Sequence, residues 1–312
     1  MPYLIQLLTV GLFCLFVAAV VFYPLWTVRQ RGRFSPFSEN RLRLPGESLR
    51  ANMADLYGKL LYCFFSVYAV AMVFFLPIGF MRSMVGGAIL MCVGAAVLSF
   101  IAYRINKIVQ SLFNYKVGLE GEEYTGQELN LLARYGAYVF HDIPYKYGNI
   151  DHVVVGYDIV FVVETKVVRK PADQKGKKES WVEYDGRKLR FPHFTTDAPL
   201  RQAKRHADCL ARVLNKGGQC SIPVIPVVAL PGWFVRSNTN PVTGIRVINP
   251  KRGKFLRAEI DRGENNSEFR SAVRKVEKLA RVDTPLASIT DPDAAEHYNL
   301  WTNGLRQGSD RS

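Results

Sequence analysis

The feature that most constrains this fold is a pair of apolar strands in the middle of the chain. Residues 149–155 and 159–166 are rich in Val and Ile and flank a Gly-Tyr-Asp turn, which is the pattern of a β-hairpin. A turn centred between Tyr157 and Asp158 places Asp151 opposite Glu164, about 4.5–5.5 Å apart at Cβ. The hairpin is therefore expected to hold two carboxylates face to face.

Such a pair of carboxylates needs a compensating charge. Glu164 and Lys166 share one face of their strand, and like charges placed opposite each other destabilise a sheet. A divalent cation would remove that cost, and Mg²⁺ or Mn²⁺ suits one or two carboxylates with waters and phosphate oxygens. Lys166 could then polarise a phosphate or an attacking water. The alternative is that Glu164 and Lys166 lie in solvent at a strand end and Asp151 is a turn residue, as a one-residue register slip would give.

Four short segments of this sequence, in this order, resemble the nuclease-related domain (NERD) family, which is placed in the PD-(D/E)XK nuclease superfamily. The resemblance runs from about Gly118 to Ala258. It implies a restriction-endonuclease-like α/β fold, a mixed sheet flanked by helices, which also fits the predicted order of helices and strands. The segments are Gly118-Leu119-Glu120-Gly121-Glu122, Ile150-Asp151-His152-Val153-Val154-Val155, Val162-Val163-Glu164-Thr165-Lys166 and Pro199-Leu200-Arg201-Gln202.

The resemblance also implies a set of site residues. The Pro–Gln segment departs from the family in one place, because the residue before Pro199 is Ala198 where relatives often have Asn. On spacing alone Gln202 would be a surface residue of its helix. The implied set is Asp151 and Glu164 as ligands of Mg²⁺ or Mn²⁺, the Thr165 carbonyl as a further ligand, Lys166 to hold or activate water, and Glu122 and Gln202 as supporting residues.

Gly118 and Gly121 open the nuclease-like domain, and Glu122 lies in a helix predicted from about Gly121 to Tyr135, which Gly136 ends. Helical spacing puts residues 122, 125, 126, 129, 132 and 133 on the inner face. An acid on that stripe is explained either by interaction with the helix amino terminus or, as the resemblance implies, by approach to the metal site.

Three uncharged runs, at about residues 4–26, 60–81 and 83–103, are each long enough to cross about 30 Å of hydrocarbon. They predict three transmembrane helices. A cleaved signal peptide is the alternative for the first run, although it lacks a basic leading region. Buried core helices are the alternative for the other two.

The loops predict the orientation of these helices. Between residues 28 and 60 seven Arg and Lys face three acids, and no basic side chain precedes the first run. The positive-inside rule then places this loop in the cytoplasm and the amino terminus outside, with a cytoplasmic carboxyl-terminal region. Anionic lipid beside the membrane is one partner that this loop would suit.

The net charge of +14 favours polyanions, and a basic cluster follows the hairpin directly. Such a run is often only a solvated surface. Its place beside an acidic cluster favours contact with a phosphate backbone, with DNA more expected than RNA. The residues concerned are Arg169, Lys170, Lys175, Lys177, Lys178, Arg201, Lys204 and Arg205.

The chain is thus expected to divide into a membrane region (1–104), a helical connector (105–117), a nuclease-like domain (118–282) and a weakly ordered tail (283–312). Neither the cysteines nor the histidines show the spacing of a disulfide framework or a zinc site. Further elements are predicted as strands at 137–143, 181–184, 189–191, 222–230 and 245–248, with a turn at Asp185-Gly186, and as helices at 199–217 and 267–282.

The expected function is that of a membrane-anchored, metal-dependent nuclease that hydrolyses phosphodiester bonds. One alternative is a nucleic-acid-binding or scaffold module that keeps the fold and cleaves nothing. Another is a membrane protein whose basic face only docks anionic lipid. Metal-dependent cleavage that Glu164→Gln or Lys166→Ala abolishes would favour the enzyme, and salt-sensitive binding indifferent to both changes would favour the binding module.

Overall fold

The structure is a computed structural model. It describes residues 41–75, 84–145, 148–170, 181–216, 221–237, 244–252, 254–260 and 264–282. The chain divides into two compact units after Arg41, and every described residue except Arg41 belongs to the second. The first predicted membrane span, the tip between the second and third, and the predicted tail lie outside the described residues.

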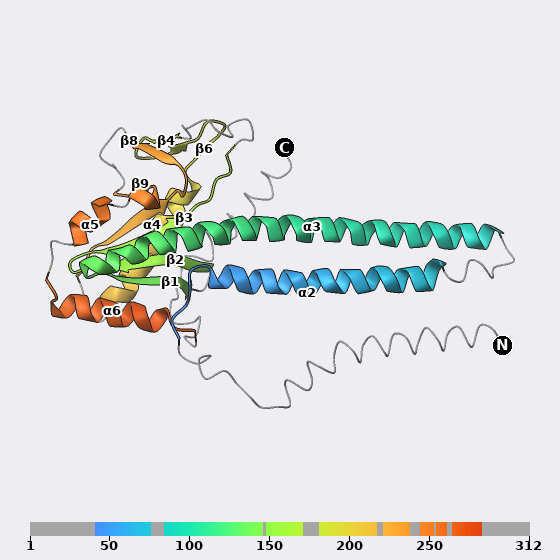
Figure 1. Ribbon diagram of the computed structural model, residues 1–312, viewed down its shortest axis with the longest axis horizontal. Helices are drawn as coiled ribbons and strands as arrows, with labels where there is room; N and C mark the ends of the chain where they lie inside the picture. The colour runs from blue at the N-terminus through green and yellow to red at the C-terminus, as the bar shows by residue number, and fades with distance from the viewer. Residues whose placement is uncertain are drawn as a thin grey trace, which may run out of the picture. The chain divides into compact units, whose positions relative to one another are not determined.

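A five-stranded mixed sheet forms the centre of the described unit (Figure 1). The strand order is β1-β2-β3-β7-β9, with β1, β2 and β3 antiparallel and with β3, β7 and β9 parallel. The strands are β1 (Tyr138–Tyr145), β2 (Gly148–Val155), β3 (Val160–Thr165), β7 (Val224–Ala229) and β9 (Arg246–Ile248). A mixed sheet was predicted, and it is confirmed.

The hairpin register was also predicted correctly. His152 lies opposite Val163, and Val155 lies opposite Val160. Continued by one residue, this register puts Asp151 opposite Glu164. The turn centre between Tyr157 and Asp158 is therefore the one that the sequence pattern indicated.

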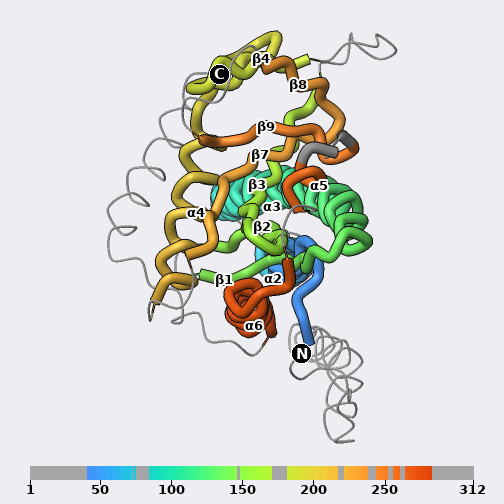
Figure 2. The backbone as a smooth tube through the Cα atoms, turned by 90° about the vertical axis from the view of Figure 1, so that its left-hand side faces the viewer, coloured from blue at the N-terminus to red at the C-terminus, as the bar shows by residue number. Residues whose placement is uncertain are grey.

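Helices cover both faces of this sheet (Figure 2). On one face, α4 (Ala198–Asn215) and α6 (Ser267–Leu279) pack on Val153, Val155, Val160 and Val162. On the other face, the end of α3 (Met84–Asn130) and α5 (Lys254–Ile260) pack on Val154, Phe161 and Val163. Strands buried on both faces are expected to read as continuous apolar runs, which is the character of β2 and β3.

A second, four-stranded sheet has the order β6-β5-β4-β8. The predicted turn at Asp185-Gly186 is confirmed, with Gly186 at φ 87°. This sheet packs on the first turns of α4 through Leu189, Leu200 and Trp233. Its strands are β4 (Trp181–Tyr184), β5 (Leu189–Arg190), β6 (Thr195–Thr196) and β8 (Phe234–Ser237), and the remaining elements are α2 (Glu47–Val70), a π-helix (Ala71–Phe75) and 3-10 helices at Leu131–Tyr135 and Pro250–Arg252.

The expected helix start at about Gly121 was wrong, because α3 runs without a break from Met84 to Asn130. The predicted helical connector, residues 105–117, forms the middle part of α3. Gly121 serves packing instead: a Cβ there would lie 2.0 Å from Val167 Cγ2. The predicted inner stripe is largely confirmed, since Glu122, Thr125, Gly126 and Leu129 are buried.

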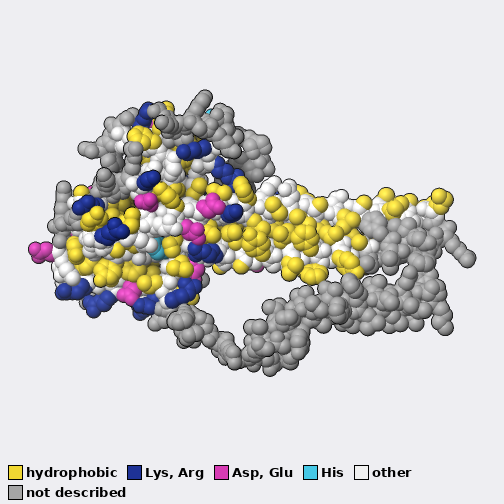
Figure 3. Space-filling model, in the orientation of Figure 1, with side chains coloured by type: hydrophobic (Ala, Val, Ile, Leu, Met, Phe, Trp, Pro, Cys, Tyr) yellow, Lys and Arg dark blue, Asp and Glu magenta, His cyan; other side chains and the backbone are white. Residues whose placement is uncertain are grey.

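Within the described part of the chain, one helix is long and apolar enough to cross a membrane, and it begins at Met84. Only 17% of its most apolar window is buried, so it is unlike the core helix of a soluble domain. It lies beside α2, whose outer surface exposes large apolar side chains such as Tyr62 and Phe64. Figure 3 shows hydrophobic side chains gathered on the long helical part of the molecule that extends away from the sheet.

Candidate active site

Asp151 on β2 and Glu164 on β3 are buried side by side, with 6% and 5% of their surfaces exposed. The backbone N–H of Thr165 donates a hydrogen bond of 2.7 Å to Asp151 Oδ2. Strand β3 is itself held at this level, because the Lys166 N–H donates to the Ala229 carbonyl of β7 at 2.9 Å. The two carboxylates are thus fixed by the sheet and not by a mobile loop.

Burial keeps both carboxyl groups from ionising readily. It raises the pKa of Asp151 well above its usual range, and the negative charge of Glu164 raises that pKa further. Burial raises the pKa of Glu164 to about 8, against the lowering effect of the positive charges on Lys166 and Arg205. Two buried acids that repel each other form a site in need of positive charge.

Glu122 joins this pair from α3, where it is 7% exposed. Burial raises the pKa of Glu122 to about 9, and the negative charges of Asp151, Asp142 and Glu164 add to the rise. A hydrogen bond from the backbone N–H of Gly46 opposes it. Glu122, Asp151 and Glu164 are called the acid set below.

Two oxygens of the acid set, Oε2 of Glu122 and Oε2 of Glu164, are buried and find no hydrogen-bond partner among the described residues. The second lies 3.1 Å from Nδ1 of His206 on α4, but this contact lacks the angle of a hydrogen bond. Burial lowers the pKa of His206 to about 3, so the imidazole is neutral and the contact is not an ion pair. Native proteins rarely leave buried oxygens unpaired, so these two atoms require an explanation.

His206 lies next to Glu164, and Tyr145 lies next to His206. Neither residue was predicted from the sequence to belong to the site. The Tyr145 hydroxyl lies 2.8 Å from His206 Nε2, and both side chains are buried. With Tyr145 donating to Nε2, the imidazole proton sits on Nδ1, the atom that faces Glu164. The available signal was that His206 follows Gln202 by four residues and so shares its helix face.

Lys166 lies close enough to the acid set to act on its charges, whereas Gln202 is placed only by its position on α4. Lys166 is exposed at the end of β3, and its charge reaches both Asp151 and Glu164. Gln202 is half-buried on α4, one turn before His206. The Thr165 side chain instead points to the other face of the sheet, where its Oγ1 lies 3.2 Å from His152 Nε2.

The predicted basic cluster divides into three parts. Lys175, Lys177 and Lys178 lie outside the described residues. Arg169 packs on α3, with its guanidinium 4.3 Å from the Phe113 ring centroid and bonded to Asn114, while Lys170 lies 5.8 Å from the Trp233 ring centroid. Arg201 and Lys204 line a pocket of about 400 Å³ with Arg187, and Arg205 is close enough to lower the pKa of Glu164.

A buried polar chain occupies the opposite face of the same strands. His141 Nδ1 lies 2.9 Å from His152 Nδ1, and His141 Nε2 lies 3.1 Å from the side-chain oxygen of Asn130. Burial lowers the pKa of His141 to about 4 and that of His152 well below its usual range. Asn130, His141, His152 and Thr165 are called the histidine chain below.

The acid set is the part of this site that could hold a metal. Among the residues that the structure describes, no three His, Cys, Asp or Glu side chains lie close enough together to hold a metal ion as they stand. Mg²⁺ needs fewer, because it keeps several waters and takes one or two carboxylates. Asp151 and Glu164 form such a pair, and the unpaired oxygens of Glu164 and Glu122 are of the hard type that Mg²⁺ prefers.

The geometry of this site agrees with a family match. Residues 117–231 match the family model of the nuclease-related domain. The match covers less than half of the chain, but it contains Glu122, Asp151, Glu164, Lys166 and Gln202. A nuclease-related domain implies a function on nucleic acid. Neither the curated proteins nor the solved structures include a match to this chain.

Proposed function

We propose that this chain is a membrane-anchored, metal-dependent nuclease that hydrolyses phosphodiester bonds in nucleic acid, most readily DNA. The observation that carries the proposal is the acid set: buried carboxylates from α3, β2 and β3 with two oxygens that lack hydrogen-bond partners within the described residues. A protein that needed these acids only for folding would have paired them or replaced them with apolar residues.

A divalent cation fits this donor set. Asp151 and Glu164 would hold it, with Glu122 and the Thr165 carbonyl supporting. Such a cation neutralises charge on a scissile phosphate and makes water more acidic. Its positive charge would also lower the raised pKa values of Glu164 and Glu122 and so stabilise the ionised forms.

The chain's own residues supply the remaining roles. Lys166, exposed beside the carboxylates, is positioned to donate a proton or a hydrogen bond to a phosphate oxygen or to water. Thr165 holds Asp151 through its N–H, and His206 restrains Glu164 from α4. Gln202 shares the helix face of His206 and is proposed to contact the bound strand.

The nucleic acid would approach along α4. Arg205 brings positive charge to the acid set, and Arg201 and Lys204 continue it into the pocket shared with Arg187. Cations beside an acidic centre attract a phosphate backbone and hold it near the carboxylates. Of the basic cluster, Arg169 and Lys170 have packing roles in addition, so they are less suited to phosphate contact.

The membrane part of the proposal rests on the apolar surface of α2 and α3. We propose three passes, at about residues 4–26, 60–81 and 83–103, with the amino terminus outside and the nuclease-related region in the cytoplasm. The exposed apolar side chains of α2 and α3 support the second and third passes. The basic loop between residues 28 and 60 supports the orientation.

Cleavage of plasmid DNA and of RNA by the full chain in lipid nanodiscs tests this function. We expect cleavage with Mg²⁺ or Mn²⁺ and none with EDTA. Glu164→Gln and Lys166→Ala should each lower the rate by about 10²–10³-fold. The matched control is Glu120→Gln, an exposed acid two residues before Glu122, which should cleave like the parent.

A second candidate is a nucleic-acid-binding module that does not cleave. It is favoured by the lack, among the described residues, of three metal-ligating side chains in contact distance. In that case binding would weaken steeply with salt, and neither Glu164→Gln nor Lys166→Ala would change it. Absence of cleavage under every metal condition, with such binding intact, would replace the nuclease by this module.

A further inference from the structure

Asp142 on β1 is buried, bonded and strained. It is 1% exposed and has a φ of 49°, the one left-handed non-glycine residue in the described part of the chain. Left-handed backbone costs of order 1–3 kcal/mol, and it persists only where surrounding contacts enforce it. The strained residue lies in the strand position opposite Asp151, because the neighbouring pairs are His141 with His152 and Ile143 with Ile150.

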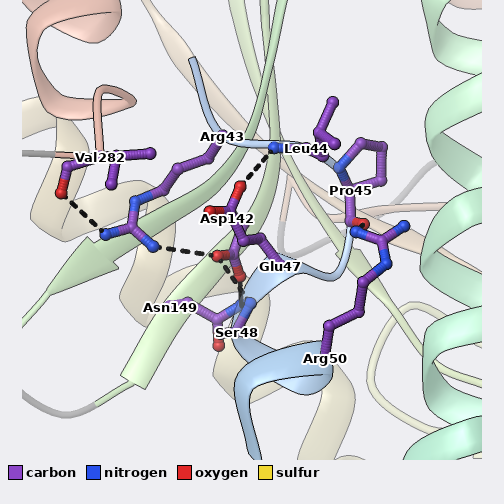
Figure 4. Close-up of polar contacts among 9 residues, drawn as sticks. All are labelled: Arg43, Leu44, Pro45, Glu47, Ser48, Arg50, Asp142, Asn149 and Val282. Atoms are coloured by element: carbon purple, nitrogen blue, oxygen red, sulfur yellow. Dashed lines mark hydrogen bonds and ion pairs between the residues drawn. The ribbon is translucent and has the colours of Figure 1, made fainter. Parts of the chain in front are cut away.

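The Asp142 carboxylate binds the amino terminus of α2 (Figure 4). The Ser48 N–H donates to Oδ2 at 3.0 Å, and the Ser48 hydroxyl donates to Oδ1 at 2.6 Å. Asn149 donates to Oδ1 at 2.8 Å, and Arg43 donates to Oδ2 at 3.4 Å. Both oxygens are therefore occupied, and Asp142 is not a free ligand of the neighbouring acid set.

These contacts replace a cap that α2 lacks. The cap residue of α2 is Gly46, which has no side chain to accept the first N–H groups of the helix. A side chain there would be strained, because Gly46 has a φ of 68°, and its Cβ would lie 2.3 Å from Leu119 Cδ1, which would have to shift. Asp142 supplies the missing acceptor from another strand.

The segment before α2, residues 42–48, is called the strap. The Arg43 N–H donates to the Ala280 carbonyl at 2.9 Å, and Leu42 forms a bridge with Arg281. Pro45 lies so close to α3 that a Cβ at Gly126 would be 2.7 Å from Pro45 Cγ. The strap therefore joins α6, β1 and α3 at one point.

The strap ends on the acid set. Its Gly46 lies against the carboxylate of Glu122, because a Cβ at Gly46 would be 3.6 Å from Glu122 Oε2. The backbone N–H of Gly46 also lowers the pKa of Glu122, against the effect of burial. Gly46 lies two residues before Ser48, which Asp142 holds by both its N–H and its hydroxyl. The contacts thus form a path from Asp142 through the α2 terminus to Glu122.

We propose that Asp142 is a positioning residue that holds the strap on α3 so that Gly46 orients Glu122 toward the cation site. The inference rests on the proposed function in that the acid set holds a divalent cation. It adds that this site is complete only while the amino terminus of α2 is docked on β1. Because α2 continues into the apolar pair with α3, the packing of these two helices and the geometry of the acid set are coupled.

Mn²⁺ binding by the full chain in nanodiscs, measured as free Mn²⁺ by electron paramagnetic resonance, tests this without cleavage. Asp142→Ala should weaken Mn²⁺ binding about 10- to 100-fold, as loss of groups that orient metal ligands does. Asp142→Asn keeps an acceptor oxygen and tolerates left-handed backbone, so it should stay within about threefold of the parent. Asp158→Ala, an exposed acid in the β2–β3 turn, is the matched control and should bind normally.

A double-mutant cycle with Glu122→Gln distinguishes the positioning role of Asp142 from a purely structural one. If Asp142 acts through Glu122, then Asp142→Ala should change Mn²⁺ binding less than about twofold in the Glu122→Gln background. An equal loss in both backgrounds overturns the inference, as does unchanged binding by Asp142→Ala. If Asp142→Ala does not fold, Ser48→Ala enters the same cycle with the same criteria.

The outcome for the proposed function is read separately from cleavage. Mn²⁺ binding that depends on Asp142, in a chain that cleaves no nucleic acid, supports the positioning role and contradicts the nuclease. A chain that cleaves but whose Mn²⁺ binding ignores Asp142 supports the nuclease and overturns the positioning role. A parent chain that binds no Mn²⁺ at millimolar concentration also overturns it.

Discussion

The acid set and the histidine chain are two buried polar groups on the same strands, and they differ in how their atoms are paired. Every ring nitrogen of His141 and His152 has a neighbour at 2.9–3.2 Å. In the acid set, Oε2 of Glu122 and Oε2 of Glu164 have no hydrogen-bond partner among the described residues. Neutral, fully paired groups stabilise a fold, whereas unpaired acids of raised pKa cost stability and are retained for what they bind.

Removing one member of each group tests whether the acid set and the histidine chain differ in their contribution to stability. His141→Ala leaves a cavity and removes the partner of the buried His152 Nδ1, so we expect a loss of about 2–4 kcal/mol in unfolding free energy. Asp151→Asn removes a buried charge while keeping an acceptor for the Thr165 N–H, so its melting temperature should equal or exceed that of the parent.

Thermal unfolding of both variants without metal, followed by intrinsic fluorescence, makes this measurement. Two variants that lose similar stability would show that the acid set is structural after all. Cleavage assays of the same samples should rank the two variants in the opposite way. Asp151→Asn should be inactive, and the His141→Ala molecules that remain folded should be active.

A second test concerns how α3 reaches the acid set. Gly121→Ala places a Cβ 2.0 Å from Val167 Cγ2, and a β-branched neighbour cannot rotate away easily. We expect a loss of about 1–3 kcal/mol together with reduced Mn²⁺ affinity, because Val167 follows Lys166 directly. Gly118→Ala is the matched control one helical turn earlier: its Cβ would lie 3.4 Å from Leu49 Cδ1, so it should be neutral or stabilising by up to about 1 kcal/mol.

A further test concerns the pH dependence of stability. Burial raises the pKa values of Glu122 and Glu164 to about 9 and about 8 in the folded chain, from an ordinary value of 4.5. Between these values the folded state binds more protons than the unfolded state, so the stability of the metal-free chain should fall as pH rises from 5 to 9. Glu122→Gln should flatten this slope.

The histidines act in the opposite direction. Burial lowers the pKa values of His141 and His206 to about 4 and about 3, so their contribution to stability rises as pH increases through the range from about 3 to 6.5. Melting temperatures at half-unit pH steps in EDTA would measure both slopes. A Glu122→Gln profile that runs parallel to the parent above pH 7 would contradict the raised pKa of Glu122, and added Mg²⁺ should restore stability at high pH.

Much of the sheet, including the register of the hairpin, could be predicted from local sequence patterns. The Val- and Ile-rich runs set the register that brings Asp151 opposite Glu164, because strand periodicity and turn position together leave one alignment. The Asp185-Gly186 turn followed from glycine chemistry. Gly121 misled the prediction of a helix start, since the same glycine can mark the end of a helix or make room for a close neighbour within one.

Only part of the site could be predicted from the sequence, because some of its residues are far apart along the chain. Glu164, Lys166 and Asp151 are close in sequence, so strand geometry alone predicts their neighbourhood. His206, Tyr145 and the bonds of Asp142 join segments far apart along the chain, and no periodicity relates them.

The sequence by itself determined the β2–β3 register, the two carboxylates on it and the apolar run that begins α3, because each depends on residues within one or two neighbouring elements. Tertiary structure alone decided that these carboxylates are buried without enough partners, that Gly46 meets Glu122, and that Asp142 caps α2. Burial and pairing depend on which distant surfaces come together, and that information is spread over the whole fold.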